Sequence, residues 1–281
     1  MIDIQNINFK YAGSKEQIFS DFSLQLNENN IYGLLGKNGT GKSTLLYLIS
    51  GLLHPQGGTV TVDGYASRER RPEMLEEIFI VPEEFELPAM TLDEYVRINQ
   101  PFYPRFSREV LRSCLEDFDL PTSLKLQSLS MGQKKKVFMS FALAAGTRLL
   151  LMDEPTNGLD IPSKSQFRKV VAECMTDNRT IIISTHQVRD VENLIDNVTI
   201  MGSRQLLFDM PVAQICDHLT FVDCKLGQEP EGAIYSQPSA LGSAVVCSRK
   251  AGDDETPLDI ELLFNAVLAN AESVSQAFAA K

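Results

Sequence analysis

The chain has 281 residues, of which 43% are hydrophobic and 22% charged, so it can bury a core without disulfides or structural metal ions. Its net charge of −11 argues against a nucleic-acid-binding protein, which would carry a basic surface. The five cysteines are scattered and none lies in a Cys-x-x-Cys pair, which favours free thiols in a reducing compartment. There is no signal-peptide pattern and no apolar stretch near the ~20 residues of a membrane span. We therefore expect a soluble protein that reaches a membrane only through a partner.

The N-terminal part of the chain has the pattern of an α/β protein. Apolar runs and alternation predict strands at residues 2–9, 22–26, 31–35, 59–62 and 78–81, the first of them as an edge strand with one slip in its alternation. The strand at 31–35 leads directly into a glycine-rich segment, and a helix is predicted after that segment, over 45–53.

The middle of the chain, from about residue 86 to residue 147, has a helical period. Thr91 and Glu94 have the spacing of a capping box, and Ser107 opens a second predicted helix. Strands return at 149–152 and 180–184 with a helix over 163–175 between them, and this alternation predicts a parallel sheet covered by helices. A closing hairpin is predicted at 198–201 and 205–208.

These elements predict two parts of unequal size. Residues 1–211 form an α/β domain, with N-terminal antiparallel strands, a parallel-sheet core and the helical subdomain inserted at about 86–147. Residues 212–281 form a small C-terminal appendage of less regular sequence, which ends in an amphipathic helix over 258–278.

The glycine-rich segment carries the most specific motif. It has the pattern Gly-x-x-x-x-Gly-Lys-Ser directly after a strand and before a helix, which is a P-loop in its required context. Backbone N–H groups of such a loop surround phosphate oxygens, the lysine reaches the β- and γ-phosphates, and the serine hydroxyl binds Mg²⁺. The predicted ATP-binding residues here are Gly36, Asn38, Gly39, Gly41, Lys42, Ser43 and Thr44.

Two carboxylates end the strand at 149–152. Asp153 and Glu154 lie at the C-terminal end of this strand, where ligands bind in open α/β sheets. We predict that Asp153 holds Mg²⁺ and that Glu154 polarises the water that attacks the γ-phosphate. The two motifs together predict a P-loop NTPase.

Three further segments narrow the class. Leu-Ser-Met-Gly-Gln at 129–133, Asn-Gly-Leu-Asp at 157–160 and Thr-His at 185–186 follow the P-loop in this order. With them, residues 2–210 resemble the ABC ATPase family. The resemblance implies a head-to-tail dimer in which ATP lies between the P-loop of one subunit and Ser130, Gly132 and Gln133 of the other. It also implies that His186 contacts the γ-phosphate and that an aromatic ring, Tyr11 or else Phe9, stacks on adenine.

The sequence departs from the family pattern at two places. Glu83 stands where the family usually has a glutamine; a carboxylate can still bind Mg²⁺, and the neighbouring Glu84 is the alternative. Met131 replaces a common glycine between the phosphate-contacting positions. The three lysines at 134–136 are interpreted as a solvated helix face, which could add positive potential near the nucleotide.

Three classes of protein fit a P-loop ATPase: a transporter motor, a soluble ABC protein of translation or DNA repair, and a P-loop kinase. No long coiled coil interrupts the chain, it carries one motor rather than two, and a kinase does not need the 129–133 segment. We therefore expect the ATP-binding subunit of an ABC transporter, and residues 102–106 and 259–266 look like those of bacterial ABC-2-type exporters. Such a subunit lies on the cytoplasmic face of the membrane, bound to a permease. The permease contact is expected along 83–103, including Phe85, Leu87, Met90 and Tyr95.

Overall fold

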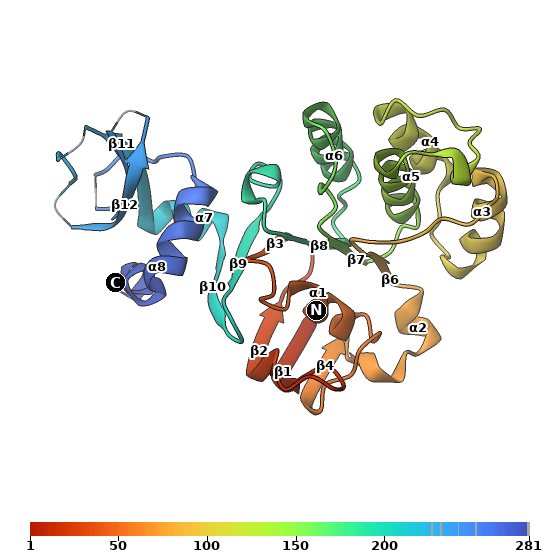
Figure 1. The fold of residues 1–281 in the computed structure, drawn as a ribbon, viewed down its shortest axis with the longest axis horizontal. Coiled ribbons are helices and arrows are strands. Elements are labelled where there is room, and N and C mark those ends of the chain that lie inside the picture. The colour runs from red at the N-terminus through yellow and green to blue at the C-terminus, as the bar shows by residue number, and fades with distance from the viewer. Residues whose placement is uncertain (226, 231, 241, 251, 280–281) are drawn as a thin grey trace.

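The computed structural model describes residues 1–225, 227–230, 232–240, 242–250 and 252–279, and in these residues the strands form three sheets. A helix-covered sheet runs through the middle of the molecule. A smaller sheet of N-terminal strands lies on the side of α1, and a third sheet belongs to the C-terminal residues (Figure 1). Within the described residues, no helix is both long and apolar enough to cross a membrane.

The central sheet has six strands in the order β10-β9-β3-β8-β7-β6. The strands β9, β3, β8, β7 and β6 pair in parallel, and only β10 is antiparallel. Every residue of β7 and β8 is buried, as expected for parallel strands covered on both faces. The predicted parallel-sheet core is therefore confirmed. The strand bounds are β3 (Ile31–Gly36), β6 (Ile78–Val81), β7 (Leu149–Asp153), β8 (Thr180–Thr185), β9 (Asn197–Met201) and β10 (Leu206–Pro211).

The N-terminal sheet is antiparallel, in the order β2-β1-β4-β5. Its strands are β1 (Ile2–Phe9), β2 (Phe19–Leu26), β4 (Gly57–Val62) and β5 (Tyr65–Ala66). The prediction that β1 is an edge strand is wrong, because β1 pairs with β2 on one side and with β4 on the other. The slip in its alternation is a bulge: Asn6 has φ +49°, and the pairing register shifts between Ile4 and Ile7.

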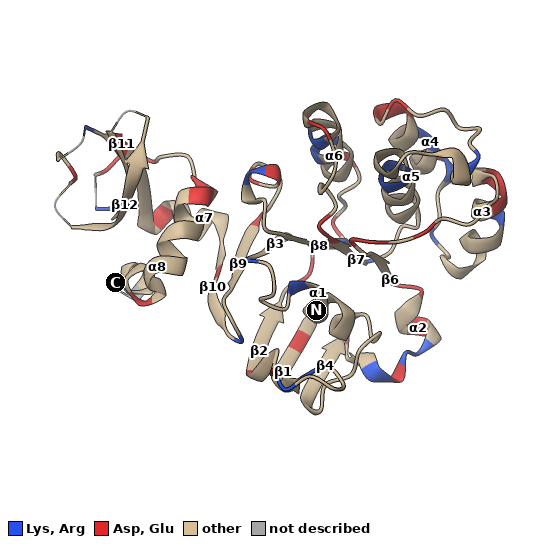
Figure 2. Ribbon diagram, viewed as in Figure 1, with Lys and Arg blue, Asp and Glu red and all other residues tan. Residues whose placement is uncertain are grey.

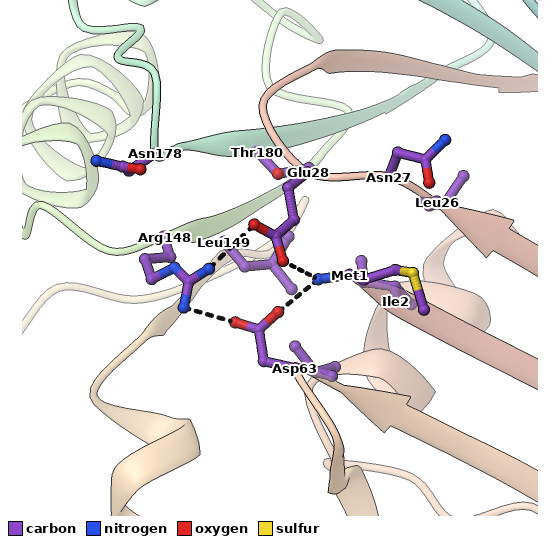
Figure 3. A pocket seen from close by; sticks show the side chains of 11 residues that line it. Met1, Ile2, Leu26, Asn27, Glu28, Asp63, Arg148, Leu149, Asn178 and Thr180 are labelled. Carbon is purple, nitrogen blue, oxygen red and sulfur yellow. Dashed lines mark hydrogen bonds and ion pairs between the residues drawn. The ribbon is translucent and has the colours of Figure 1, made fainter.

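A charged cluster joins this N-terminal sheet to the start of β7 (Figure 3). The amino group of Met1 pairs with Glu28 and Asp63, and the Arg148 guanidinium contacts both carboxylates at 3.2 Å. Arg148 comes immediately before β7 and Asp63 immediately after β4. The four groups therefore link the two sheets, although exposed pairs of this kind contribute only about 0–1 kcal/mol each.

Helices cover both faces of the central sheet, with α1 (Lys42–Ile49) on one face and α5 (Met131–Ala144) and α6 (Ile161–Glu173) on the other (Figure 1). The helical subdomain holds α3 (Leu92–Asn99), α4 (Arg108–Asp117) and α5. The Thr91–Glu94 capping box and the Ser107 cap are both present, as predicted. The remaining short helices among residues 1–211 are η1 (Ser67–Glu69), α2 (Pro72–Leu75), η2 (Gln100–Phe102), η3 (Leu126–Ser128) and η4 (Val188–Asp190).

The C-terminal residues contain more strand than the sequence predicted. After α7 (Val212–His218), the strands β11 (Leu219–Cys224), β12 (Ala233–Ser239) and β13 (Gly242–Ser248) form a sheet in the order β11-β13-β12. The predicted terminal helix is present as α8 (Ile260–Ala279), but Asn270 has a non-helical φ of −159° and breaks it in two.

The C-terminal elements share the core of the central sheet. Ile215, Val246 and Leu263 belong to the same cluster of buried residues as Leu35 and Leu150. The helix α8 contacts η4 and β10 as well as β12 and β13. The division of the chain at residue 211 stays a prediction. Residues on both sides of it contribute to one cluster of buried side chains.

Candidate active site

The P-loop connects β3 to α1 in the geometry that its glycines allow. Gly39 and Gly41 have φ values of +83° and +99°, which side-chain-bearing residues rarely adopt. A Cβ atom on Gly41 would also lie 2.8 Å from the side chain of Ile18. Gly41 is the N-cap of α1, so the first N–H groups of the helix point into the loop, where they form a site for anions.

Lys42 is buried at the base of this loop. Its ammonium group donates to the carbonyl oxygens of Gly36 at 2.7 Å and Lys37 at 3.3 Å, and it lies 3.7 Å from Oε1 of Glu154. Burial lowers the pKa of Lys42, whereas the nearby carboxylates of Glu154 and Asp153 raise it. The positive charge is thus positioned between the phosphate-binding loop and the end of β7.

Asp153 ends β7 and is fully buried. It accepts a hydrogen bond from the Ser184 hydroxyl of β8. Burial raises the pKa of Asp153, the negative charges of Glu83 and Glu154 raise it further, and hydrogen bonds from Ser184 and Ser43 oppose the change. Burial and two neighbouring carboxylates therefore disfavour the ionised form of Asp153 in the absence of a ligand.

A buried carboxylate of this kind fits a divalent cation that binds together with a nucleotide. Among the described residues, no cluster of three or more His, Cys, Asp or Glu side chains could hold a metal by itself. Mg²⁺ in nucleotide sites typically takes only one or two carboxylates and completes its ligands with phosphate oxygens and water. A buried aspartate beside a P-loop serine provides that donor set.

Glu154 is held in position by the end of β8. It has φ +44°, and its N–H donates to the Ser184 carbonyl at 2.9 Å. Its Oε2 accepts from the Thr185 hydroxyl at 3.0 Å. Its Oε1 lies 2.8 Å from Nδ1 of His186 and accepts from the His186 N–H at 3.0 Å. The sequence placed His186 at this edge of the sheet, and the structure brings it into direct contact with the carboxylate.

The loop after β6 contributes Glu83 rather than Glu84 to the pocket. Glu83 lines the same pocket as the P-loop, and its Oε1 accepts a hydrogen bond from Nδ2 of Asn157 at 2.8 Å. Glu84 is exposed. The contact joins two of the predicted motifs, which the sequence alone did not connect.

Tyr11 lies at the mouth of this pocket, which has a volume of about 310 Å³. The ring is 42% exposed, and its hydroxyl is 3.0 Å from Oγ1 of Thr44. Phe9 is buried in the core of the N-terminal sheet and packs edge-on against Tyr11, with the ring centres 5.1 Å apart. Of the two aromatic candidates, only Tyr11 is free to stack on a ligand. The described residues that line the pocket are Tyr11, Ile18, Asn38, Gly39, Gly41, Lys42, Ser43, Thr44, Glu83 and Glu154.

The 129–133 segment lies apart from this pocket, at the N-terminus of α5 and across the central sheet from α1 (Figure 1). Ser130 caps the helix and forms a capping box with Gln133. Met131 is exposed, and the Leu159 side chain lies 3.8 Å from where Gly132 would carry a Cβ atom. Ser130, Gly132 and Gln133 are thus not joined with the P-loop of their own chain.

The interpretation of residues 134–136 as a solvated face is wrong. Lys135 is only 6% exposed, and its ammonium group donates to the carbonyl oxygens of Glu154 at 3.2 Å and Asn157 at 2.8 Å. Burial lowers its pKa, and the charges of Glu83 and Glu154 raise it. Lys136 also has partners, the Phe118 carbonyl at 3.4 Å and the Gln166 side chain at 3.0 Å. Lys135 therefore connects α5 to the segment after β7, a role that no sequence pattern indicated.

A groove of about 650 Å³ lies between the segment 50–80 and the helical subdomain. Of the residues predicted to contact a permease, Leu87, Met90 and Tyr95 all pack against the core, and Tyr95 also lines this groove. Phe85 stacks on Phe138 with the ring centres 4.5 Å apart. Burial raises the pKa of Tyr95 to about 12, so its hydroxyl stays neutral. The aromatic residues that line the groove are Phe79, Tyr95, Phe102, Tyr103, Phe138 and Phe141.

Figure 2 shows where charge gathers along the chain, and acidic residues lie on the segment between β6 and α3 and at the ends of the central strands. Basic residues lie on α5 and α6 and near the start of α1 (Figure 2). Basic and acidic residues are therefore both present on the elements that surround the P-loop (Figure 2).

Comparison with known proteins gives the same assignment as the site geometry. A family model described as ABC transporter matches residues 19–157. The chain is 30% identical over 222 residues to the linearmycin resistance ATP-binding protein LnrL of Bacillus subtilis, covering 77% of this chain and 71% of that protein. It is 27% identical over 239 residues to the ABC transporter ATP-binding protein YtrB of the same organism, covering 84% and 81%.

Solved structures share the fold. The ATP-binding subunit of an ABC transporter superposes with a TM-score of 0.69 at 24% identity, covering 77% of this chain and 92% of that one. A dimeric bacterial ABC transporter cassette superposes with a TM-score of 0.66 at 23% identity, covering 75% and 99%. The predicted α/β P-loop fold is confirmed, and the chain belongs to the family of ABC transporter ATP-binding proteins, as an ATP-hydrolysing transporter subunit.

Proposed function

We propose that this subunit hydrolyses MgATP in the pocket between the P-loop and the ends of β7 and β8, with Glu154 as the residue that activates water. The contacts of Glu154 support this role most directly. Its carboxylate is fixed by Thr185 and by two groups of His186, while the Lys42 ammonium lies 3.7 Å away. A carboxylate held in this way can accept a proton from a water molecule that attacks phosphorus.

The other site residues have complementary roles in this proposal. The P-loop N–H groups and Lys42 bind the phosphates, Tyr11 stacks on the base, and His186 holds the attacking water beside Glu154. Ser43, Asp153 and Glu83 would hold Mg²⁺, which neutralises charge on the β- and γ-phosphates.

A second ATPase subunit completes the site in this proposal. Ser130, Gly132 and Gln133 lie at a helix N-terminus, which binds anions, but they are apart from the pocket of their own chain. In a head-to-tail dimer they would contact the γ-phosphate held by the partner subunit. ATP then joins two subunits, and its hydrolysis releases them.

The groove lined by aromatic side chains is the proposed docking site for a membrane permease on the cytoplasmic face. Phe102 at its rim is 67% exposed, which is unusual for a large aromatic residue on a free surface. The likeness of residues 102–106 and 259–266 to ABC-2-type exporters, and the resistance function in the name of LnrL, support export rather than import. A non-transport role in translation or DNA repair is not favoured by the relatives found.

The test is affinity purification of the tagged full chain from detergent-solubilised membranes, with ATP hydrolysis measured on the same preparations. We expect Phe102→Ala to lose a stoichiometric multi-span membrane protein and to keep basal ATP hydrolysis. The matched control is Ile98→Ala, which removes another apolar side chain that is 51% exposed but does not line the groove. Equal recovery of the membrane protein with both variants would contradict the docking site, and recovery of ribosomes or DNA-repair factors alone would favour the non-transport class.

A further inference from the structure

Two thiols from different helices, α4 and α6, meet away from the residues that line the ATP pocket. The Sγ atoms of Cys114 and Cys174 are 3.6 Å apart. Cys114 lies near the end of α4 in the helical subdomain and is buried. Cys174 is the C-cap of α6, which packs on the central sheet, and is partly exposed.

The surroundings of the two thiols are unequal. Cys174 lines an open cavity of about 580 Å³, together with Glu173, Thr176 and Arg179. The contact with Cys114 lowers the pKa of Cys174, and the Arg179 charge lowers it further against the opposing effect of burial. The same contact, together with burial, raises the pKa of Cys114. Of the two, Cys174 is the accessible thiol and lies in the same cavity as the Arg179 cation, as an attacking thiol must.

We propose that Cys114 and Cys174 are a reversible thiol–disulfide site, in which Cys174 attacks a low-molecular-weight disulfide and Cys114 resolves the product. In the first step the Cys174 thiolate bonds to one sulfur of the small disulfide, whose S–S bond breaks and releases one thiolate that takes up a proton. In the second step Cys114 loses its proton, attacks Cys174 Sγ and displaces the other small thiolate. Two protein thiols are oxidised, and one small disulfide is reduced to two thiols.

The observed separation requires only a small movement. A disulfide has an S–S length of about 2.05 Å, so the two sulfurs must approach by roughly 1.5 Å. Cys174 is the C-cap of its helix: its N–H donates to the Val170 carbonyl at 3.1 Å, and its own carbonyl accepts from the Arg179 guanidinium at 2.9 Å. Because the backbone of Cys174 is held at both ends, the approach of the two sulfurs must come mainly from rotation of the side chains.

The bond would tie α4 to α6, two helices that neighbour the 129–133 and 157–160 segments. The helix α4 packs against α5, whose N-terminus is the 129–133 segment, and α6 begins directly after Asp160 of the 157–160 segment. This consequence rests on the proposed function: if ATP turnover requires these segments to move relative to each other, the disulfide slows it.

Mass spectrometry of the reduced full chain after treatment with glutathione disulfide tests the site itself. After alkylation of free thiols, we expect a single Cys114–Cys174 linked peptide that disappears with dithiothreitol, while Cys216, Cys224 and Cys247 are alkylated. The link should persist in Cys247→Ser, the matched control, and be absent in Cys174→Ser. Alkylation of both Cys114 and Cys174 in the treated wild type, or glutathione that stays on Cys174, would overturn the proposal without any variant having to fold.

ATP hydrolysis of the same samples tests the consequence. We expect oxidation to lower turnover of the wild type at least threefold, with recovery after dithiothreitol, and to leave Cys174→Ser unchanged. Equal turnover of the linked and reduced wild type would overturn the regulatory effect. A reduced protein that hydrolyses no ATP would instead contradict the proposed function, while the peptide map would still decide the thiol site.

Discussion

At the scale of single residues, the buried charge of Asp153 lowers the stability of the nucleotide-free protein, although the site needs this carboxylate to bind its ligand. Its carboxylate is fully buried, and its pKa is raised by burial and by Glu83 and Glu154. A raised folded-state pKa means that the folded protein binds the proton more tightly than the unfolded chain does. The ionised carboxylate therefore lowers the free energy of unfolding at pH values above that pKa.

We predict that Asp153→Asn raises the free energy of unfolding of the nucleotide-free protein by about 0.5–2 kcal/mol at neutral pH, while ATP hydrolysis is lost. The amide keeps an oxygen that can accept from Ser184 but removes the buried charge. The gain should shrink as the pH falls through the pKa of Asp153. Thermal melts of both proteins over a pH series measure this difference, and a variant that is less stable at neutral pH would contradict the account.

Tyr11 combines two contacts that substitutions can separate. The exposed ring is available for stacking on a base, and the hydroxyl contacts Thr44 at 3.0 Å. Base–aromatic stacking contributes about 1–3 kcal/mol, so we expect Tyr11→Ala to weaken ATP binding roughly 5- to 150-fold. Tyr11→Phe keeps the ring and should bind within a few-fold of wild type. If calorimetric titration finds the same affinity for all three proteins, Tyr11 does not stack on the nucleotide.

At the scale of elements, α5 is the connection between the 129–133 segment and the catalytic strand end. Lys135 makes this connection through the carbonyl oxygens of Glu154 and Asn157. Its removal leaves two carbonyl groups without this donor, at a cost of about 1–3 kcal/mol in stability. It also loosens the backbone that positions the Glu154 carboxylate.

We predict that Lys135→Met lowers ATP turnover roughly 10-fold or more, because small displacements of catalytic groups have large effects on rate. Lys134→Met, at the neighbouring position of the same helix, is the control and should retain turnover. Steady-state hydrolysis at saturating ATP measures both. Equal rates for the two variants would mean that the Lys135 contacts do not position Glu154.

The elements also show what a sequence can and cannot predict. The P-loop, the strand before it, the helix after it and the Thr91 and Ser107 caps were predictable because each depends on residues close together in the chain. The central place of β1 was not, because its pairing with β4 joins residues 49 to 60 positions apart. The strand β12 was missed since Tyr-Ser-Gln-Pro-Ser at its end has neither alternation nor apolar character.

In the candidate site, too, features that depend on residues close together in the chain were predictable, and contacts between distant residues were not. Motif spacing indicated which residues act, but the contact of Glu83 with Asn157 and the burial of Lys135 come from loops and layers that meet only in the folded chain. A lysine flanked by two other lysines on a helix is usually exposed to solvent. Only the tertiary structure could therefore identify Lys135 as a buried hydrogen-bond donor.

At the scale of the whole molecule, one buried cluster extends from the helical subdomain through the central sheet into the C-terminal elements. We therefore predict that the two parts unfold together. Leu263→Ala, which truncates a fully buried side chain of α8, should lower the free energy of unfolding by about 2–5 kcal/mol and shift one cooperative transition. Glu272→Ala, at an exposed position of the same helix, should have little effect. A separate early transition in calorimetry, with ATP binding retained above it, would contradict a shared core.

The central claim is that Glu154 activates water in an ATP site that a second subunit completes. The most direct measurement is ATP hydrolysis and molar mass of Glu154→Gln, with Glu84→Gln as the matched control at an exposed carboxylate. We expect Glu154→Gln to bind ATP, to lose at least about 100-fold in turnover and to form an ATP-dependent dimer, while Glu84→Gln hydrolyses ATP as the wild type does. Wild-type turnover by Glu154→Gln, or a variant that stays monomeric with ATP bound, would contradict this account.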